Sequence, residues 1–418
     1  QPLSGEKDRC RPEEQTRYCF HRIRLPPHHL LEKTSRQQYL ADDERPADNE
    51  RWPGTRPRDD RALSRPAASR NMDDRDRGDS PPLGKVAPDF FEDSVAPNLG
   101  AERSDVALGP THGVDFGLLN LDGTGLAVAT DPLSVLPGLG FERAGRFALH
   151  VALSDVAVAG VAPSHLAVSF SLPESVTDEQ FDALWTGIHE EWAALGTSIV
   201  TGHTARYPGA EFPWVGAATA MGVCDPPAVV RPDGARPGDR LLVTRGPAVE
   251  TAGLFASLYP ERLGERGLGA ETVADAAAGL DETRLVGDAV AAAEAGDVSA
   301  MHDATEGGLL GACCEMAASA EVRFEIDAEA APLRSGVEAV CDALGIDPWK
   351  TTSSGTLVLA VPSADAAAVR RAIDARGTPV ADVGRVVEGS GVQFRGETWT
   401  EPPRDESWDA YAELAGTG

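Results

Sequence analysis

The chain has 418 residues, and 42% of them are apolar, which is enough to form the cores of two ordinary domains. No apolar run approaches the ~20 residues that cross a bilayer, so we expect no membrane-spanning segment. Acidic residues outnumber basic ones by 66 to 38, for a formal net charge of -28, and this charge argues against a nucleic-acid-binding protein.

Residues 1–71 differ in composition from the rest of the chain. They are rich in Arg, Pro, Asp and Gln and lack a periodic apolar pattern, so they cannot offset the entropy cost of ordering. We expect a disordered extension ahead of Met72, which looks like the natural beginning of the folded protein. The extension resembles neither a secretory signal nor a transit peptide, and none of the six cysteines forms a CxxC pair. A cytoplasmic location is therefore expected.

After residue 112, strand-like and helix-like segments alternate. Short apolar runs bounded by turn residues predict strands at 114–120, 125–131, 164–173, 197–207, 213–224, 239–245, 322–327 and around 378–398. Longer apolar or amphipathic segments predict helices at 143–161, 177–196, 248–259, 270–296, 309–319, 335–345 and 365–377. A stretch dense in Pro, Gly and Asp at 225–239 separates the two halves. The pattern predicts an α+β fold with mixed sheets and two domains, residues 72–233 and 234–418.

Four places put polar groups among small apolar residues: Asp115, Asp131, Asp155 and the pair His203–Thr204. A buried carboxylate costs several kcal/mol unless a cation or hydrogen-bond donors compensate it. Oxygen ligands of this kind favour Mg²⁺, which joins a few carboxylates to the phosphates of a substrate. Taken singly, each residue is also explained by a turn, a cap or a satisfied histidine.

The stretch MHDATEGG, residues 301–308, precedes an apolar helix. Asp303 or Thr305 has the chemistry of a helix cap, which is one interpretation. The other is that Asp303, Thr305 and the pair Gly307–Gly308 form a phosphate-facing helix start, because glycine lets backbone N–H groups approach an anion closely.

Five motifs occur in order along the chain: ATDPL, ALSDVAVAGVAPSHLAVSFSLP, GTSIVTGHTARY, MHDATEGGLLGACCEMA and GIDPWKTTSSGTLVLAV. Their order and spacing resemble those of the PurM-like superfamily, which includes aminoimidazole ribonucleotide (AIR) synthetase, thiamine-monophosphate kinase, selenophosphate synthetase and the hydrogenase-maturation protein HypE. The resemblance spans roughly residues 83 to 398 and is closest to HypE.

The resemblance implies an N-terminal αβ domain whose sheet dimerises into a barrel, and a C-terminal α/β sandwich domain. It also implies ATP in a cleft, Mg²⁺ held by aspartates, a homodimer and a maturation-protein partner. By motif position, Asp115, Asp131 and Asp155 match the metal- and phosphate-binding aspartates. Gly202, with His203 and Thr204, matches the family's Gly-Asp-Thr or Gly-His-Thr turn.

The chain also departs from HypE. HypE ends in a cysteine that carries the group to be dehydrated, whereas this sequence ends in AELAGTG; Glu306 stands where HypE has Arg, and His203 stands where it has Asp. We therefore expect an enzyme that transfers the γ-phosphate of Mg-ATP to an oxygen of a small substrate.

In this hypothesis the catalytic residues are His203, Thr204, Asp303 and Thr305, and Gly202, Gly307 and Gly308 join the three aspartates in binding the nucleotide. A kinase of the thiamine-monophosphate type is the nearest alternative, although its Asp-Ile-Ser-Asp-Gly turn is missing. The remaining alternative is an ATP-binding accessory protein without useful turnover.

Overall fold

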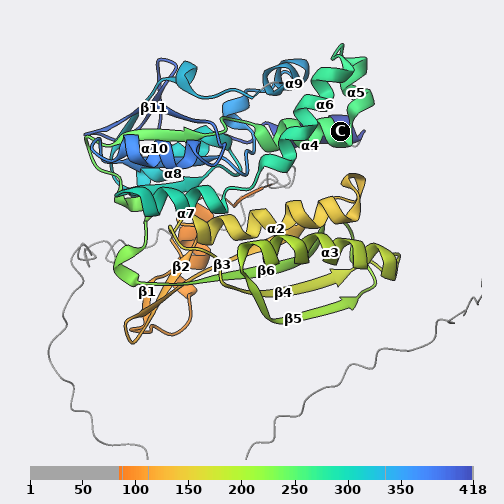
Figure 1. Ribbon diagram of the computed structural model, residues 1–418, viewed down its shortest axis with the longest axis horizontal. Helices are drawn as coiled ribbons and strands as arrows, with labels where there is room; N and C mark the ends of the chain where they lie inside the picture. The colour runs from red at the N-terminus through yellow and green to blue at the C-terminus, as the bar shows by residue number, and fades with distance from the viewer. Residues whose placement is uncertain (1–83, 87, 112, 335, 417–418) are drawn as a thin grey trace, which may run out of the picture. The chain divides into compact units, whose positions relative to one another are not determined.

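Two sheets, one from each half of the chain, organise the fold (Figure 1). The structure is a computed structural model that describes residues 84–86, 88–111, 113–334 and 336–416, all within the unit Ser80–Gly418. The extension predicted for residues 1–71, and the beginning predicted at Met72, lie outside the described residues. The predicted α+β class is confirmed by the helices and the two sheets.

The first sheet has six strands in the order β1-β2-β3-β6-β4-β5. Its strands are β1 (Val106–Leu108), β2 (Gly117–Leu121), β3 (Thr124–Ser134), β4 (His165–Leu172), β5 (Ser198–Arg206) and β6 (Trp214–Cys224). The predicted hairpin is confirmed: β2 and β3 pair antiparallel through Asp122 and Gly123, which both have positive φ. Three short helical segments precede this sheet: α1 (Pro88–Phe90), η3 (Phe91–Val95) and η4 (Ala96–Asn98).

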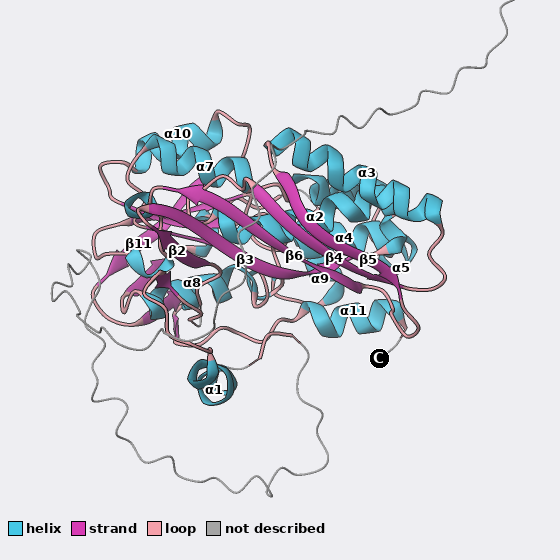
Figure 2. Cartoon of the chain, turned by 90° about the horizontal axis from the view of Figure 1, so that it is seen from below, coloured by secondary structure: helices cyan, strands magenta, loops and turns pink. Residues whose placement is uncertain are grey.

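Helices α2 (Phe141–Ala157) and α3 (Asp178–Leu195) pack on one face of this sheet (Figure 1). Thr177 forms a capping box with Gln180 at the start of α3, and Gly196 ends the helix in the left-handed conformation, so the predicted cap and stop are confirmed. The opposite face of the sheet carries no helix in the view of Figure 2. Val200 and Trp214 are each 55% exposed, which leaves apolar side chains uncovered on this sheet.

The second sheet has seven strands in the order β13-β12-β9-β11-β7-β10-β8. Its strands are β7 (Arg240–Thr244), β8 (Ala300–Asp303), β9 (Arg323–Ile326), β10 (Leu357–Val361), β11 (Val380–Val387), β12 (Gly391–Phe394) and β13 (Glu397–Trp399). The helices of this half are α4 (Val249–Leu258), α5 (Pro260–Glu265), α6 (Ala270–Ala278), α7 (Val286–Ala295), α8 (Gly308–Ser319), α9 (Val337–Leu344), α10 (Ala366–Asp374) and α11 (Ser407–Ala415).

Both faces of the second sheet are buried, each in its own hydrophobic core. Leu242 and Leu359 point into a core that continues through α7 and α10 to α2 and the first sheet. Leu241 and Val358 point the opposite way, into a core completed by α8. This alternation follows from the two-residue period of a strand. The edge strand β8 also contacts helix α2.

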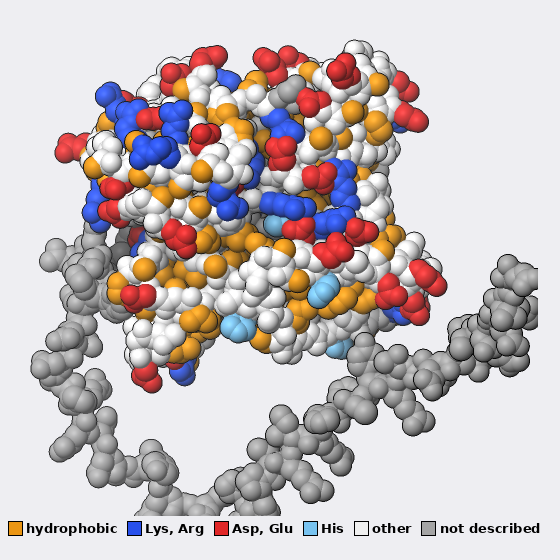
Figure 3. All heavy atoms as spheres, viewed as in Figure 1, with side chains coloured by type: hydrophobic (Ala, Val, Ile, Leu, Met, Phe, Trp, Pro, Cys, Tyr) orange, Lys and Arg blue, Asp and Glu red, His pale blue; other side chains and the backbone are white. Residues whose placement is uncertain are grey.

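Ion pairs join the two halves beside the shared core. Arg143 of α2 donates to Asp281 at 2.9 Å, and Arg284 lies 2.7 Å from the carboxylate of Glu191 on α3. Figure 3 shows basic and acidic side chains next to one another across the middle of the visible face. These pairs link helices α2 and α3 of the first half to the segment between α6 and α7 of the second half.

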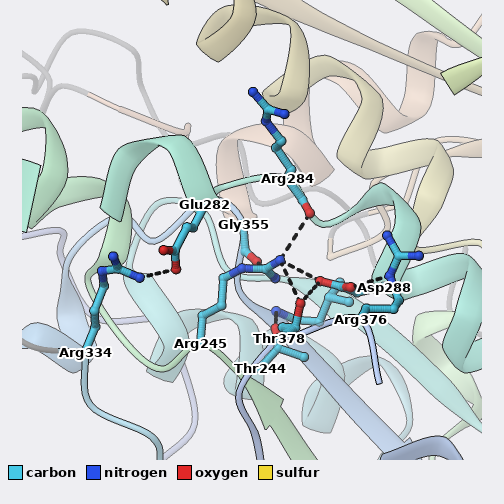
Figure 4. A network of polar contacts seen from close by, with 10 residues as sticks. Thr244, Arg245, Glu282, Arg284, Asp288, Arg334, Gly355, Arg376 and Thr378 are labelled. Atoms are coloured by element: carbon cyan, nitrogen blue, oxygen red, sulfur yellow. Dashed lines mark hydrogen bonds and ion pairs between the residues drawn. The ribbon is translucent and has the colours of Figure 1, made fainter. Parts of the chain in front are cut away.

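A buried polar network ties the second sheet to its helices (Figure 4). Asp288 of α7 accepts hydrogen bonds from Arg245 at 2.6 Å, Arg376 at 2.7 Å and Thr378 at 2.9 Å. Arg245 also donates to the carbonyl oxygen of Gly355, in the turn that leads into β10. The network therefore holds the ends of β7 and β10 in place.

Three local expectations differ from the structure. The segment 202–204 is not a turn, because it lies within β5, where Gly202 pairs with Val168 in parallel register. The start of the MHDATEGG stretch belongs to the buried strand β8 rather than to a turn. The helix expected at 270–296 is divided into α6, a 3₁₀ turn at Gly279–Glu282 and α7. Within the described residues, no helix combines the length and apolarity needed to cross a membrane.

Candidate active site

His302 and Asp303 end strand β8 at the junction between the two halves, close to helix α2. Both are buried, with His302 fully inaccessible and Asp303 2% exposed. The His302 Nδ1 atom lies 2.7 Å from the carbonyl oxygen of Asp303, and its Nε2 atom lies 3.3 Å from the Glu315 carboxylate on α8. Each ring nitrogen thus faces an oxygen, which suits a histidine protonated on both nitrogens.

Asp115 approaches this pair from the loop before β2. One of its carboxylate oxygens lies 3.2 Å from His302 Nδ1. The side chain is 15% exposed, so it borders solvent while contacting a buried histidine. A residue of the first half therefore meets the end of a strand in the second half.

Asp131 and Asp155 bring two further carboxylates to the junction. Asp131 lies near the end of β3, and Asp155 lies in the last turn of α2, where it is 9% exposed. Their carboxyl groups interact with each other, and both interact electrostatically with Asp303. The four aspartates thus form one continuous cluster from four separate segments of the chain.

Burial and mutual repulsion make this cluster hard to ionise. Burial raises the pKa of Asp115 to about 6, against the attraction of His302. Burial, followed by repulsion from Asp131 and Asp303, raises the pKa of Asp155 well above its usual range. Burial alone lowers the pKa of His302, but Asp115, Asp303 and the Glu315 carboxylate raise it well above its usual value. One histidine does not balance all the carboxylates.

The cluster has the chemistry of a divalent cation site. The carboxylates of Asp115 and Asp303 each offer a ligand atom, and these atoms lie within 4.8 Å of each other and of a ring nitrogen of His302. Asp303 Oδ1 is buried and has no hydrogen-bond partner among the described residues. A buried carboxylate oxygen without a donor is costly, and a cation would compensate it. The residues therefore fit Mg²⁺, with carboxylate oxygens as its preferred ligands.

The turn after Asp303 leads into helix α8, whose N-terminus is not capped by a side chain. Helix α8 begins at Gly308 with Gly307 as its N-cap, and no side chain caps it, so capping by Asp303 or Thr305 is wrong. The Gly307 N–H group donates to Asp405 at 2.9 Å, and the Gly308 N–H group donates to the carbonyl oxygen of Thr305. A phosphate would reach the Gly307 N–H group only by displacing Asp405.

Close packing explains the second glycine of this turn. Gly308 has φ +66°, and a Cβ atom there would lie 2.6 Å from the carbonyl oxygen of Thr351. Any side chain would push α8 away from the loop before β10. The glycine pair thus brings the helix start close to that loop, beside the aspartate cluster.

Gly202, His203 and Thr204 lie apart from the aspartates within one chain. They sit on the edge strand β5, and Gly202 belongs to the same row as Asp131, three strands away. At about 4.8 Å per strand this separation is roughly 14 Å. His203 Nε2 lies 3.0 Å from the hydroxyl group of Tyr207, on the exposed edge. The described contacts bring together Asp115, Asp131, Asp155, Asp303 and Thr305 but do not include these three residues.

The sequence interpretation missed His302, Glu315 and Lys85. The Lys85 ammonium group lies 3.2 Å from Thr305 Oγ1 and 4.0 Å from the Glu315 carboxylate. Two signals were present: Lys85 is one of only two lysines after residue 72, and His302 interrupts an otherwise apolar strand immediately before Asp303. Nothing in the spacing of Glu315 indicated that α8 would turn it toward His302.

Both halves match known family descriptions. Residues 113–224 match the AIR synthase related protein, N-terminal domain, and residues 236–397 match the AIR synthase related protein, C-terminal domain. The aspartates at 115, 131 and 155 fall in the first match, and the stretch 301–308 falls in the second. Lys85 precedes both.

Individual relatives point to the same family. Carbamoyl dehydratase HypE of Rhizobium leguminosarum bv. viciae is 31% identical over 280 residues, which cover 66% of this chain and 77% of that protein. The crystal structure of E. coli HypE matches with a TM-score of 0.58 and 28% identity, covering 76% of this chain and 96% of that chain. The hydrogenase maturation protein HypE in complex with ATP shares the fold, with a TM-score of 0.50 and 24% identity over 73% of this chain and 87% of that chain. The chain therefore belongs to the AIR synthase-related family with the PurM-like fold, and it is similar to the HypE members of that family.

Proposed function

We propose that this protein is an enzyme that binds Mg-ATP and transfers its γ-phosphate to an oxygen of a small substrate, which activates that oxygen for loss or replacement. The observation that carries the proposal is the meeting of Asp115, Asp131, Asp155 and Asp303 at the buried junction of the two halves. The ATP-bound state of a HypE protein with the same fold supports the choice of nucleotide.

In this proposal the chain's own residues bind and orient the reactants. Asp115, Asp131 and Asp155 hold the metal ion and with it the phosphates, while Thr305 borders the phosphate end of the site. Mg²⁺, when bound, supplies positive charge that neutralises the phosphates. Positioning and charge neutralisation account for most of the catalysis in reactions of this class.

The proposed transfer breaks one bond to the γ-phosphorus, forms another and moves one proton. The bond between the γ-phosphorus and its bridging oxygen breaks, and its electron pair leaves with ADP. A new bond forms from the substrate oxygen to the same phosphorus. In this proposal the Asp303 carboxylate takes the proton of the substrate oxygen as that bond forms.

We further propose that two copies of the chain pair through the open face of the first sheet. Val200 is 55% exposed on the edge strand and Val223 is 51% exposed on β6, and apolar side chains of this kind mark an interaction surface. Pairing there would place Gly202, His203 and Thr204 at an interface, where they would orient the phosphate acceptor. A cytoplasmic location and a maturation-protein partner are part of the same proposal.

The reaction can be tested by phosphorus NMR of the full chain with Mg-ATP, with and without the small-molecule fraction of a cell extract. We expect ATP to be consumed in the presence of the extract, with either a new phosphorylated product or ADP plus inorganic phosphate. EDTA provides the matched control, because removing the metal ion should stop the consumption while leaving the fold intact.

The products separate the alternatives. A stable phosphorylated product identifies a small-molecule kinase, and ADP plus phosphate identifies activation followed by loss of the phosphate. ATP that binds but is never consumed with the extract would contradict an enzymatic role and favour a nucleotide-binding accessory protein.

A further inference from the structure

Lys85 reaches the aspartate cluster from a segment that precedes both family-matched regions. Its ammonium group lies 3.2 Å from Thr305 Oγ1 and 4.0 Å from a Glu315 carboxylate oxygen. It also interacts electrostatically with Asp115, Asp303 and, more weakly, Asp155. The cluster thus includes a cation that the family-matched regions do not supply.

The backbone around Lys85 is fixed against the turn that precedes α8. The Lys85 N–H group donates to the Glu306 carboxylate at 2.5 Å. Gly84 has φ +103°, and a Cβ atom there would lie 2.7 Å from Glu306 Oε2 and 3.3 Å from Trp408 Nε1. The positive φ favours glycine here, and the absence of a side chain lets the main chain lie directly on Glu306. The backbone of Lys85 is therefore anchored beside this turn, while its ammonium group can still change position.

The charge balance of the site gives this lysine a role. Among the described residues, no arginine forms an ion pair with Asp115, Asp155 or Asp303, and His302 is fully buried behind them. A polyphosphate placed beside these carboxylates is repelled unless cations lie between the two sets of negative charge. The Lys85 side chain is 51% exposed. Of the two described cationic side chains at the cluster, Lys85 and His302, it is therefore Lys85 that can turn outward to a ligand.

Lys350, the other lysine after residue 72, makes its contacts away from the aspartate cluster. Lys350 lies 3.7 Å from both Asp347 and Glu406 and sits over the ring of Trp399. It shares no contact with the aspartate cluster in the described structure, and this makes it a suitable control for the loss of one positive charge.

We propose that Lys85 binds the terminal phosphate of the nucleotide and so distinguishes ATP from ADP; this inference rests on the proposed function. The ammonium group exchanges its contacts with Thr305 and the Glu315 carboxylate for phosphate oxygens, as a lysine acting as a point charge does. Lys85 stays protonated throughout, because partial burial lowers its pKa less than Glu315, Asp115 and Asp303 raise it. It forms no covalent bond with the phosphate.

The test is calorimetric titration of the full chain with ATP and with ADP, each in excess Mg²⁺, for the wild type, Lys85→Met, Lys85→Arg and the control Lys350→Met. We expect Lys85→Met to bind ATP about 10-fold more weakly, because a charged hydrogen bond to phosphate is lost. Its affinity for ADP should change by less than about 2-fold. Lys85→Arg should recover part of the ATP affinity, and Lys350→Met should match the wild type for both nucleotides.

Three results would overturn the role of Lys85 alone. The first is that Lys85→Met binds ATP as the wild type does, and the second is that it binds ATP and ADP equally more weakly. The third is that it binds ATP more tightly, which would mean that Lys85 only fills the place of a metal ion. Absence of ATP binding by the wild type would instead overturn the proposed function, and with it this inference. Thermal unfolding of each variant checks that it is folded at the temperature of the titration.

Discussion

Replacing Asp155 with Asn is expected to weaken Mg-ATP binding by about 100-fold or more while leaving the protein folded. Asp155 lies in the last turn of α2, where it interacts electrostatically with Asp131, Asp303 and Asp115. Removing one charged partner from a buried ionic site costs about 3 kcal/mol or more, which corresponds to over about 100-fold in Kd. Calorimetric titration with Mg-ATP measures the change.

The same substitution, Asp155→Asn, is expected to maintain or increase the thermal stability of the ligand-free protein, although it weakens nucleotide binding. The pKa of Asp155 is raised in the folded protein above its ordinary value of 3.8, so the folded chain retains a proton that the unfolded chain releases above that value. The resulting loss of stability grows as the pH rises above 3.8, and an uncharged Asn removes it. Asp155→Asn should therefore unfold at the same or a higher temperature than the wild type at pH 7 without ligand.

The matched control is Asp182→Asn, which removes the same charge from an exposed position on α3. It should bind Mg-ATP as the wild type does. Calorimetry that finds the affinity of Asp155→Asn unchanged would contradict the assignment of Asp155 to the nucleotide site.

Replacing Asp288 with Ala is expected to lower the free energy of unfolding by about 3–5 kcal/mol, because it leaves two arginines without their buried partner. The Asp288 side chain is 2% exposed and accepts from Arg245, Arg376 and Thr378 (Figure 4). Arg245, itself buried, would retain its bonds to backbone carbonyl oxygens but lose its counter-charge. Urea denaturation followed by circular dichroism measures the loss.

An exposed pair serves as the control for Asp288. Arg231 holds Asp233 through two hydrogen bonds of 2.8 Å, but both side chains are 38% exposed. Asp233→Ala should therefore cost only about 0–1 kcal/mol. Equal effects of the two substitutions would mean that the network in Figure 4 contributes no more than a surface ion pair.

The parts of the fold that local chemistry determines were predictable. Thr177 and Gly196 mark the two ends of α3 because a capping box and a left-handed stop depend only on neighbouring residues. Asp122 and Gly123 likewise form the turn of the β2–β3 hairpin, with positive φ at both residues. In these places the residue type and its spacing determine the structure.

The aspartate cluster was predictable only in part. Asp115, Asp131 and Asp155 stand out because each interrupts an apolar pattern, and the structure gathers them. Lys85 and His302 join them only through tertiary contacts, since a segment far ahead of the first sheet folds back onto the turn before α8. No local pattern encodes that approach.

The backbone of the two glycine-containing motifs likewise depends on residues that are distant in sequence. Gly202 lies within a strand that pairs with β4, so its motif does not form a turn in this chain. Gly307 meets Asp405, from almost one hundred residues further along the chain, where the local sequence suggested only a helix cap or a phosphate. In both cases a partner distant in sequence determines what the backbone does.

The central claim is that aspartates distant in sequence share one divalent cation and a triphosphate at the junction of the two halves. Crystals grown with Mn²⁺ in place of Mg²⁺ and a non-hydrolysable ATP analogue test it directly through the anomalous scattering of manganese. The account predicts an anomalous peak about 2–2.5 Å from carboxylate oxygens of the cluster formed by Asp115, Asp131, Asp155 and Asp303. A nucleotide bound with its metal ion away from all four carboxylates would contradict it.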